Sequence, residues 1–204
     1  FLDMLPDDPK REAEYLEKEL VNLATARIKA AQEEGKSSPK VKDLVKAEQQ
    51  LEAKIKDLKS LKIKDRGMTF EETGVDALLV DEAHRYKKLQ FQTQMGNIKG
   101  IDRSASKRGL SMLMKTRWVQ ENNDGKNVVM ATGTPISNTV AEAWNFMRYI
   151  NPKMLKEYGM ENFDSFASLF GDTVSGMELT AGGTWKVVQR FAKYTNGPEL
   201  IAAF

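Results

Sequence analysis

The chain has 204 residues, enough for one ordinary domain with an appendage and too few for two large domains. Its 41% apolar residues form no run approaching the roughly 20 that a bilayer span needs, so a membrane protein is excluded and we expect a cytoplasmic one. The absence of cysteine excludes disulfides and Cys-ligated zinc, and the single histidine excludes His clusters. Any metal should therefore be a hard cation held by carboxylates and by the oxygens of a ligand.

The net charge of +2 conceals strong sorting of charge along the chain. Residues 7–34 carry five basic and eight acidic side chains, whereas residues 36–66 carry ten and five. Residues 84–117 carry nine basic side chains against Asp102 alone. A charge run is usually a solvated face, but for 84–117 a polyanion partner is equally favoured because the block adjoins the motifs described below.

Residues 1–66 are predicted to form an antiparallel, coiled-coil-like helical hairpin. Asp8 followed by proline predicts the first helix start, Gly35 its end, and Ser38 followed by proline the second start. The apolar positions at helical spacing in the first helix are Leu16, Leu20, Leu23, Ala24 and Ile28. The positive second helix is either a surface that tracks a duplex backbone or a solvated spacer, which is the commoner meaning of such a helix.

Residues 67–152 have the pattern of an open α/β sheet. Residues 76–80 (DALLV) and 127–131 (NVVMA) are short apolar runs with polar ends, typical of buried parallel strands. Residues 105–121 between them place apolar side chains on one helical face. Strand, helix and strand in this order predict a βαβ unit.

A further helix is predicted from a cap at Asn138 to a stop at Asn151, which a proline follows. Residues 153–204 are predicted to extend the same domain, with a helix over 163–170, a hairpin turning at Gly182-Gly183 and a final helix start at Pro198. The large aromatic residues predicted to lie in the core are Trp118, Trp144, Trp185, Phe163, Phe166 and Phe170.

Two adjacent carboxylates follow the first predicted strand, in the string LLVDEAH over residues 78–84. Open α/β sheets bind ligands at the carboxyl ends of their strands. In a nucleoside triphosphatase, the first acid, here Asp81, holds the water shell of Mg²⁺, and the second, here Glu82, positions the attacking water. His84 would lie just beyond them, linking the nucleotide to a neighbouring loop. The alternative is an ordinary acidic strand end with a surface histidine.

A second string, ATGTPISN over residues 131–138, comes directly after the second predicted strand. The hydroxyls of Thr132 and Thr134 and the intervening Gly133 suit a loop that moves with the state of a bound nucleotide. The alternative is a strand-to-helix turn that uses these residues only for their turn geometry. Because both strings occur in this order on these elements, coincidence is disfavoured.

Together the two strings resemble motifs of superfamily 2 helicases, and within them the Swi/Snf-type translocases. Asp81 to Arg85 (DEAHR) resembles motif II. Residues 132–138, with Glu142, Trp144 and the run 149–152 (YINP), resemble motif III and its trailing helix. The chain is also similar to the very large helicase and adenine-specific DNA methylase fusions of phages and conjugative elements. The runs that carry this similarity are residues 70–84, 165–178 and 190–200.

The resemblance implies a partial RecA-like lobe of the P-loop NTPase type, carrying the helical hairpin as an addition. It implies ATP hydrolysis coupled to translocation on double-stranded DNA, with ATP and Mg²⁺ as cofactors. It also implies that the intact protein carries a fused methylase. Asp81 and Glu82 would be catalytic, with Asp81 binding Mg²⁺ through water, while His84, Thr132, Gly133 and Thr134 would couple ATP to DNA. The residues expected to bind DNA are Arg85, Lys87, Lys88, Arg103, Lys107 and Arg108.

The spacing between the two motifs is longer than in Swi/Snf relatives, and the surplus is the basic stretch 89–104. That stretch is either a DNA-contacting insertion or a disordered loop, and the loop is slightly favoured.

The resemblance also implies a phosphate-binding loop and a second lobe. Residues 30–37 (AAQEEGKS) approach the loop pattern, but no apolar strand precedes them and Glu33 and Glu34 would repel phosphate. We therefore expect no ATP turnover by these residues alone and expect the remaining lobes of the same polypeptide as partners. Two other hypotheses stay open: a non-catalytic DNA-binding or protein-interaction module that retains the motifs, and a small ATPase that uses Lys36.

Overall fold

The computed structural model describes residues 2–61, 67–91, 93, 95, 98–99, 106–137, 139–179 and 182–203. They belong to two compact units, unit 1 (Phe1–Val75) and unit 2 (Asp76–Phe204). Helices combine with a small parallel sheet and a helical N-terminal region, so the structure is mixed α/β. Within the described ranges, no helix is long and apolar enough to cross a bilayer.

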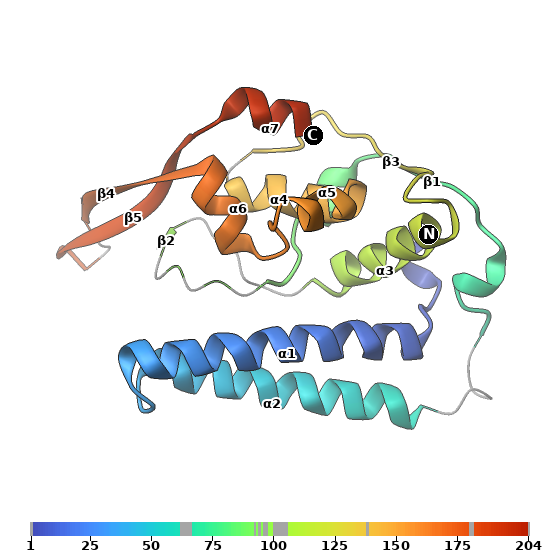
Figure 1. The fold of residues 1–204 in the computed structure, drawn as a ribbon, viewed down its shortest axis with the longest axis horizontal. Helices are drawn as coiled ribbons and strands as arrows, with labels where there is room; N and C mark the ends of the chain where they lie inside the picture. Colours follow the sequence, from blue (N-terminus) through green and yellow to red (C-terminus); the bar gives the residue numbers. More distant parts are fainter. Residues whose placement is uncertain are drawn as a thin grey trace. The chain divides into compact units, whose positions relative to one another are not determined.

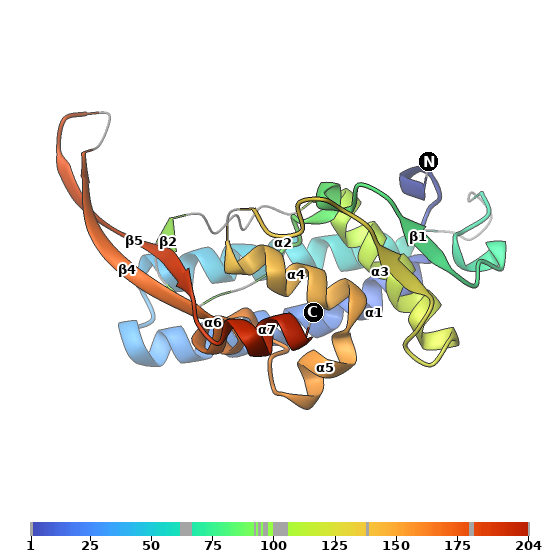
Figure 2. The ribbon, with the colours of Figure 1, turned by 90° about the horizontal axis from the view of Figure 1, so that it is seen from above.

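Unit 1 consists of η1 (Leu2–Met4), α1 (Pro9–Glu34), α2 (Pro39–Ser60) and η3 (Glu71–Thr73). The helices α1 and α2 run side by side as a hairpin (Figures 1 and 2). The Asp8 side chain accepts a hydrogen bond from the Lys10 amide at 3.0 Å, and the Ser38 hydroxyl accepts one from the Val41 amide at 3.2 Å. Both predicted helix starts are therefore confirmed.

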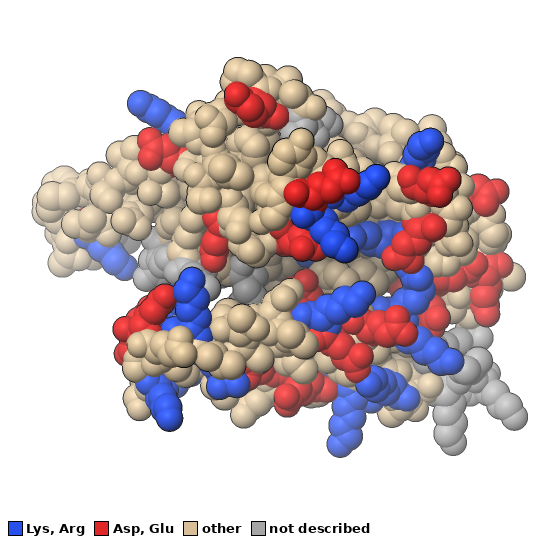
Figure 3. Space-filling model, in the orientation of Figure 1, with Lys and Arg blue, Asp and Glu red and all other residues tan. Residues whose placement is uncertain are grey.

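Ion pairs join the two helices of unit 1. They link Arg27 to Glu48 at 2.9 Å, Lys54 to Glu12 at 2.7 Å, and Lys59 to Glu17. Opposite charges on the two helices thus pair with each other, and both signs of charge are intermingled over these helices in Figure 3. This pairing favours the interpretation of α2 as a spacer over that of a helix that tracks DNA.

The near-match to a phosphate-binding loop lies at the turn between these helices. Residues 30–34 are the end of α1, and Gly35 follows with a φ of 86°. Because a helix and not a strand precedes Gly35, the element that would present a phosphate-binding loop is missing here.

Unit 2 consists of β1 (Leu78–Val80), η4 (Ala83–Tyr86), β2 (Ile98–Lys99), α3 (Lys107–Asn122), β3 (Val128–Met130), α4 (Val140–Ile150), α5 (Pro152–Glu157), α6 (Phe163–Phe170), β4 (Gly171–Leu179), β5 (Trp185–Tyr194) and α7 (Gly197–Ala203). The strands β1 and β3 pair in parallel with Leu79 opposite Val129, and α3 lies between them in the chain. The predicted strand, helix, strand order is confirmed. The helix predicted to begin at Asn138 is present as α4, but its N-cap is Thr139, whose side chain makes no capping hydrogen bond, and Asn138 lies outside the described residues.

The β1–β3 sheet is covered on one face only. Leu78 and Val80 are 4% and 6% exposed, whereas Leu79 and Val129, on the opposite face, are 77% and 54% exposed. Successive side chains of a strand point to opposite faces, and no described element covers the face of Leu79. The expectation of strands buried on both sides is therefore wrong for this face.

The hydrophobic core of unit 2 lies among α4, α5 and α6. Phe163 is fully buried, and its ring centroid lies 4.6 Å from that of Phe91 and 5.7 Å from that of Trp144. Phe166 and Phe170 are buried in the same cluster. These predicted core positions are confirmed for the aromatic residues of α4 and α6.

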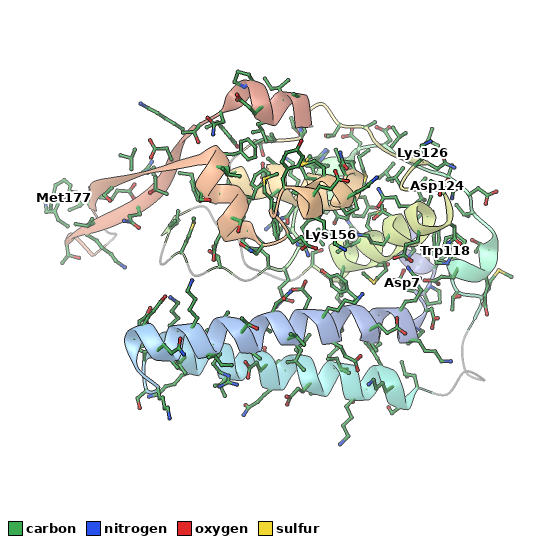
Figure 4. All side chains as sticks on the ribbon, viewed as in Figure 1. Asp7, Trp118, Asp124, Lys126, Lys156 and Met177 are labelled. Atoms are coloured by element: carbon green, nitrogen blue, oxygen red, sulfur yellow. The ribbon has the colours of Figure 1, made fainter. Side chains whose placement is uncertain are left out.

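The strands β4 and β5 form a long antiparallel ribbon that projects from the helices of unit 2, with β2 beside β5 (Figures 1 and 2). Phe191 packs against the core, but the tip lies beyond it. Trp185, predicted as a core residue, is 65% exposed at this tip, opposite Leu179. Met177 lies at the same far end in Figure 4. The prediction for Trp185 is wrong because only the base of the ribbon reaches the core.

Candidate functional site

The carboxyl ends of β1 and β3 lie side by side because the two strands pair in parallel. Beyond the strands, the Ala131 amide donates to the Val80 carbonyl at 2.8 Å, and the Ala83 amide donates to the Ala131 carbonyl at 3.0 Å. The pairing therefore continues past both strands. It joins the turn at Asp81 and Glu82 to the segment 131–137 and makes the two predicted motifs neighbours.

The turn after β1 places both carboxylates at the surface. Glu82 has the left-handed backbone conformation, with a φ of 52°, and its amide donates to Asp81 Oδ1 at 2.8 Å. A positive φ is uncommon for a residue with a side chain, and such strained residues cluster at functional sites. Asp81 and Glu82 are both exposed, so their carboxylate oxygens are accessible to a ligand or water.

His84 links the two motifs through its side chain. Its Nδ1 lies 3.0 Å from Glu82 Oε2 and 3.4 Å from Thr132 Oγ1. When Nδ1 carries the proton, the ring donates to both oxygens. Thr132 Oγ1 also accepts from the Thr134 amide at 3.2 Å, across the exposed Gly133. Three of the four predicted coupling residues, His84, Thr132 and Thr134, thus lie in one network with Glu82, and Gly133 lies between the two threonines in the chain.

A second network lies at the other end of the segment 131–137. Glu142, in the first turn of α4, accepts from the Ser137 amide at 2.5 Å and from the Ser137 hydroxyl at 3.1 Å. Lys87 Nζ donates to the same hydroxyl at 2.9 Å and lies 3.5 Å from the Glu142 carboxylate. The side chains of Lys87 and Glu142 are only 11% and 15% exposed. Lys87, predicted to bind DNA, therefore has partners inside the protein.

Buried polar residues of α4 hold the chain that follows the first motif. Asn145 Nδ2 donates to the Lys87 carbonyl at 2.8 Å. The Tyr149 hydroxyl lies 2.9 Å from the Tyr86 carbonyl and 3.0 Å from the Gly109 carbonyl. Asn145 was not predicted as a functional residue, and Tyr149 was named only within the run 149–152 that resembles the end of the motif III helix. The available signal was the spacing of Asn145 and Tyr149, which are four residues apart and therefore lie on one face of the predicted helix.

The other predicted DNA-binding residues lie in two places. Arg85 and Lys88 are exposed in and just after η4, and Lys107 and Arg108 are exposed in the first turn of α3. Arg103 lies outside the described residues, as does most of the stretch 89–104 in which it occurs. The DNA-binding role of these residues stays a prediction.

Tyr194, at the end of β5, responds to the charge of Glu142. Burial and, secondarily, this charge raise the pKa of Tyr194 from 10.0 to about 12. The folded chain therefore keeps a proton that the unfolded chain loses, so this contribution to stability is complete below pH 10.0 and is lost as the pH rises towards 12. Tyr194 is 44% exposed, so solvent screening keeps the stability change small.

We expect the ultraviolet titration of phenolate absorbance to contain a step with a midpoint of about 12 that Tyr194→Phe removes. Glu142→Gln should move that step to lower pH, because it removes a charge that opposes ionisation. A difference curve between wild type and Tyr194→Phe that is centred on 10.0 would contradict the assignment.

Almost the whole chain matches a known protein family. A family model described as a probable helicase domain matches residues 2–204. The chain belongs to this helicase-domain family. The strands, helices and contacts described above are thus those of a helicase-related domain, and no solved structure matches it.

Two relatives of the helicase domain are much longer proteins. The chain is 28% identical over 107 residues to Defense against restriction protein B of Escherichia phage P1. This match covers 51% of the chain and 5% of that protein. The chain is 25% identical over 114 residues to Helicase SWR1 of Candida glabrata. This match covers 53% of the chain and 7% of that protein. The chain therefore spans less than a tenth of the length of either relative.

Proposed function

We propose that this helicase-domain chain is part of the first motor lobe of an ATP-dependent, Swi/Snf-type DNA translocase. The observation that carries the proposal is the contact network between the two motifs at the carboxyl ends of paired parallel strands. Glu82 and His84 follow β1, Thr132 follows β3, and their side chains meet there. Ligands of open α/β sheets bind at this edge.

In this proposal, Asp81 and Glu82 act on the phosphate end of ATP. The described residues contain no group of three or more acidic or histidine side chains that could hold a metal by itself. Mg²⁺ commonly takes only one or two carboxylates and completes its shell with water and phosphate oxygens, so the single exposed Asp81 carboxylate suits it. Glu82, oriented by His84, would accept hydrogen bonds from the attacking water.

The open face of the β1–β3 sheet supports a lobe that other parts of a longer polypeptide complete. Parallel sheets normally have both faces covered, yet Leu79 and Val129 are exposed. In a protein as long as the relatives, further strands and helices would cover this face and include the phosphate-binding loop. The second lobe, and a methylase in keeping with the resemblance, would follow elsewhere in the same polypeptide, acting in the cytoplasm.

Double-stranded DNA is the proposed partner of the exposed cations around η4 and α3. Arg85, Lys88, Lys107 and Arg108 are exposed there. Neutralising phosphates with such side chains releases counterions, so binding should weaken steeply as salt rises.

Steady-state ATP hydrolysis by the intact protein, with and without double-stranded DNA, tests the proposal. We expect Mg²⁺-dependent turnover that DNA stimulates, and no turnover by the 204-residue chain alone. DNA binding that ignores nucleotide and persists after Asp81→Asn with Glu82→Gln, without turnover, would instead support a non-catalytic module. Turnover by the isolated chain that Lys36→Ala abolishes would support the small-ATPase hypothesis.

A further inference from the structure

Glu142 is the meeting point of three segments of unit 2. It belongs to α4, it accepts from the amide and hydroxyl of Ser137, and it faces Lys87 just after η4. Lys87 also donates a hydrogen bond to the Ser137 hydroxyl at 2.9 Å, so the three side chains contact one another. The carboxylate thus binds both motif-bearing segments at once, although it is absent from the network of Glu82 and His84.

The low exposure of this ion pair makes it more effective than a surface pair. The side chains of Lys87 and Glu142 are 11% and 15% exposed, so water screens their attraction little. Hydrogen bonds to an ionised acceptor are also stronger than neutral ones, and the Glu142 carboxylate accepts from both the amide and the hydroxyl of Ser137. Glu142 therefore restrains Ser137 more firmly than a neutral side chain would.

The hydrogen bonds between Glu142 and Ser137 also restrain Thr132, because Ser137 and Thr132 both belong to the segment 131–137. The segment 131–137 is held at its first residue by the backbone bonds of Ala131 and at its last by Glu142. Thr132, which contacts His84 at 3.4 Å, lies between these two anchors. Releasing the second anchor would leave only the packing of Ile136 against the core to hold this end of the segment, while the first strand end stays in place.

We propose that Glu142 is a positioning residue of the motor, which holds Ser137 against Lys87 so that Thr132 stays in contact with His84; this role rests on the proposed function. Glu142 touches no nucleotide in this role. It sets the distance between the two motifs and hence the extent to which DNA binding changes ATP turnover.

The test measures ATP turnover by the intact protein, at saturating double-stranded DNA and without DNA, for wild type and Glu142→Gln. We expect the stimulated-to-basal ratio to fall roughly tenfold with the KM for ATP unchanged, since a 1 Å misplacement of reacting groups can cost about 100-fold. A loss of folded protein would lower both rates equally and leave the ratio unchanged. The ratio therefore separates positioning from a merely structural role.

The matched control is Glu157→Gln, the same substitution at an exposed glutamate that pairs only with Lys153 on α5 in the described part of the chain. It should leave the ratio unchanged. Ser137→Ala should also lower the ratio. Because Ser137 is exposed, this variant provides the test if the Glu142 variants do not fold. An unchanged ratio in folded Glu142→Gln and in Ser137→Ala would overturn the inference while leaving the proposed function intact.

Hydrogen exchange supplies a readout that is independent of activity. Amides of the peptide covering 131–137 should exchange at least roughly tenfold faster in Glu142→Ala, the factor expected from losing a charge-assisted hydrogen bond. Unchanged exchange would overturn the restraint. A wild-type protein without DNA-stimulated turnover would overturn the proposed function, and with it the positioning role, whatever the exchange shows.

Discussion

Replacing Glu82 by glutamine is expected to lower ATP turnover by the intact protein roughly 10²- to 10⁴-fold, the range for loss of a positioned general base. The amide keeps the size of the side chain and its contact distance to His84 Nδ1, now 3.0 Å, but cannot take a proton from water. Binding of ATP should persist because Glu82 is not expected to hold the phosphates. The measurement is steady-state turnover with saturating DNA, beside nucleotide binding by equilibrium titration.

Glu161→Gln provides the matched control for this substitution. Glu161 is exposed just before α6 and belongs to neither motif, so its replacement should leave turnover unchanged. Asp81→Asn should also abolish turnover, and added Mg²⁺ should restore part of it if the residue acts through the metal. Turnover within a fewfold of wild type in Glu82→Gln would refute the catalytic assignment.

Truncating Phe163 to alanine is expected to destabilise unit 2 by about 3–5 kcal/mol, the usual cost of removing a buried aromatic side chain. Phe163 is fully buried, and its ring lies near the rings of Phe91, Trp144 and Phe191 at centroid distances of 4.6, 5.7 and 6.1 Å. Its removal would leave a cavity between α4, α6 and the base of the ribbon. Urea unfolding followed by tryptophan fluorescence measures the change, because Trp144 borders this cavity.

Leu169→Ala on the same helix is the control for cavity formation. Leu169 is 45% exposed, so its truncation should cost about 1 kcal/mol or less. Equal unfolding free energies for the two variants would show that α6 does not anchor the core.

Local chemistry allowed the sequence to predict the helical hairpin and the positions of the motifs. The Asp8 and Ser38 caps act within one turn of their own helices, so their effect is readable from neighbouring residues. The same holds for the helix over 163–170, whose bounds agree with α6. The short strands were found because their apolar runs end in polar residues, and their parallel pairing followed from the helix between them.

Other features could not be read from local pattern. Trp185 is an apolar residue in a strand, but whether the strand lies on the core or projects from it depends on the length of the ribbon. Leu79 likewise belongs to an apolar run, and its exposure depends on which layers cover the sheet. Charge and the resemblance suggested Lys87 as a DNA contact, whereas Glu142, 55 residues away in the chain, binds its side chain.

The sequence by itself determined the helical hairpin with its caps at Asp8 and Ser38, the order of β1, α3 and β3, the two motif strings and hence the helicase-related family, because these depend on residues close together in the chain. Only the tertiary structure decided which motif residues meet. Parallel pairing of β1 with β3 brings His84 to Thr132, and the placement of α4 brings Glu142 to Lys87 and Ser137. Such contacts join residues about 50 positions apart, and the distance between them is set by packing of the whole unit, which no local pattern encodes.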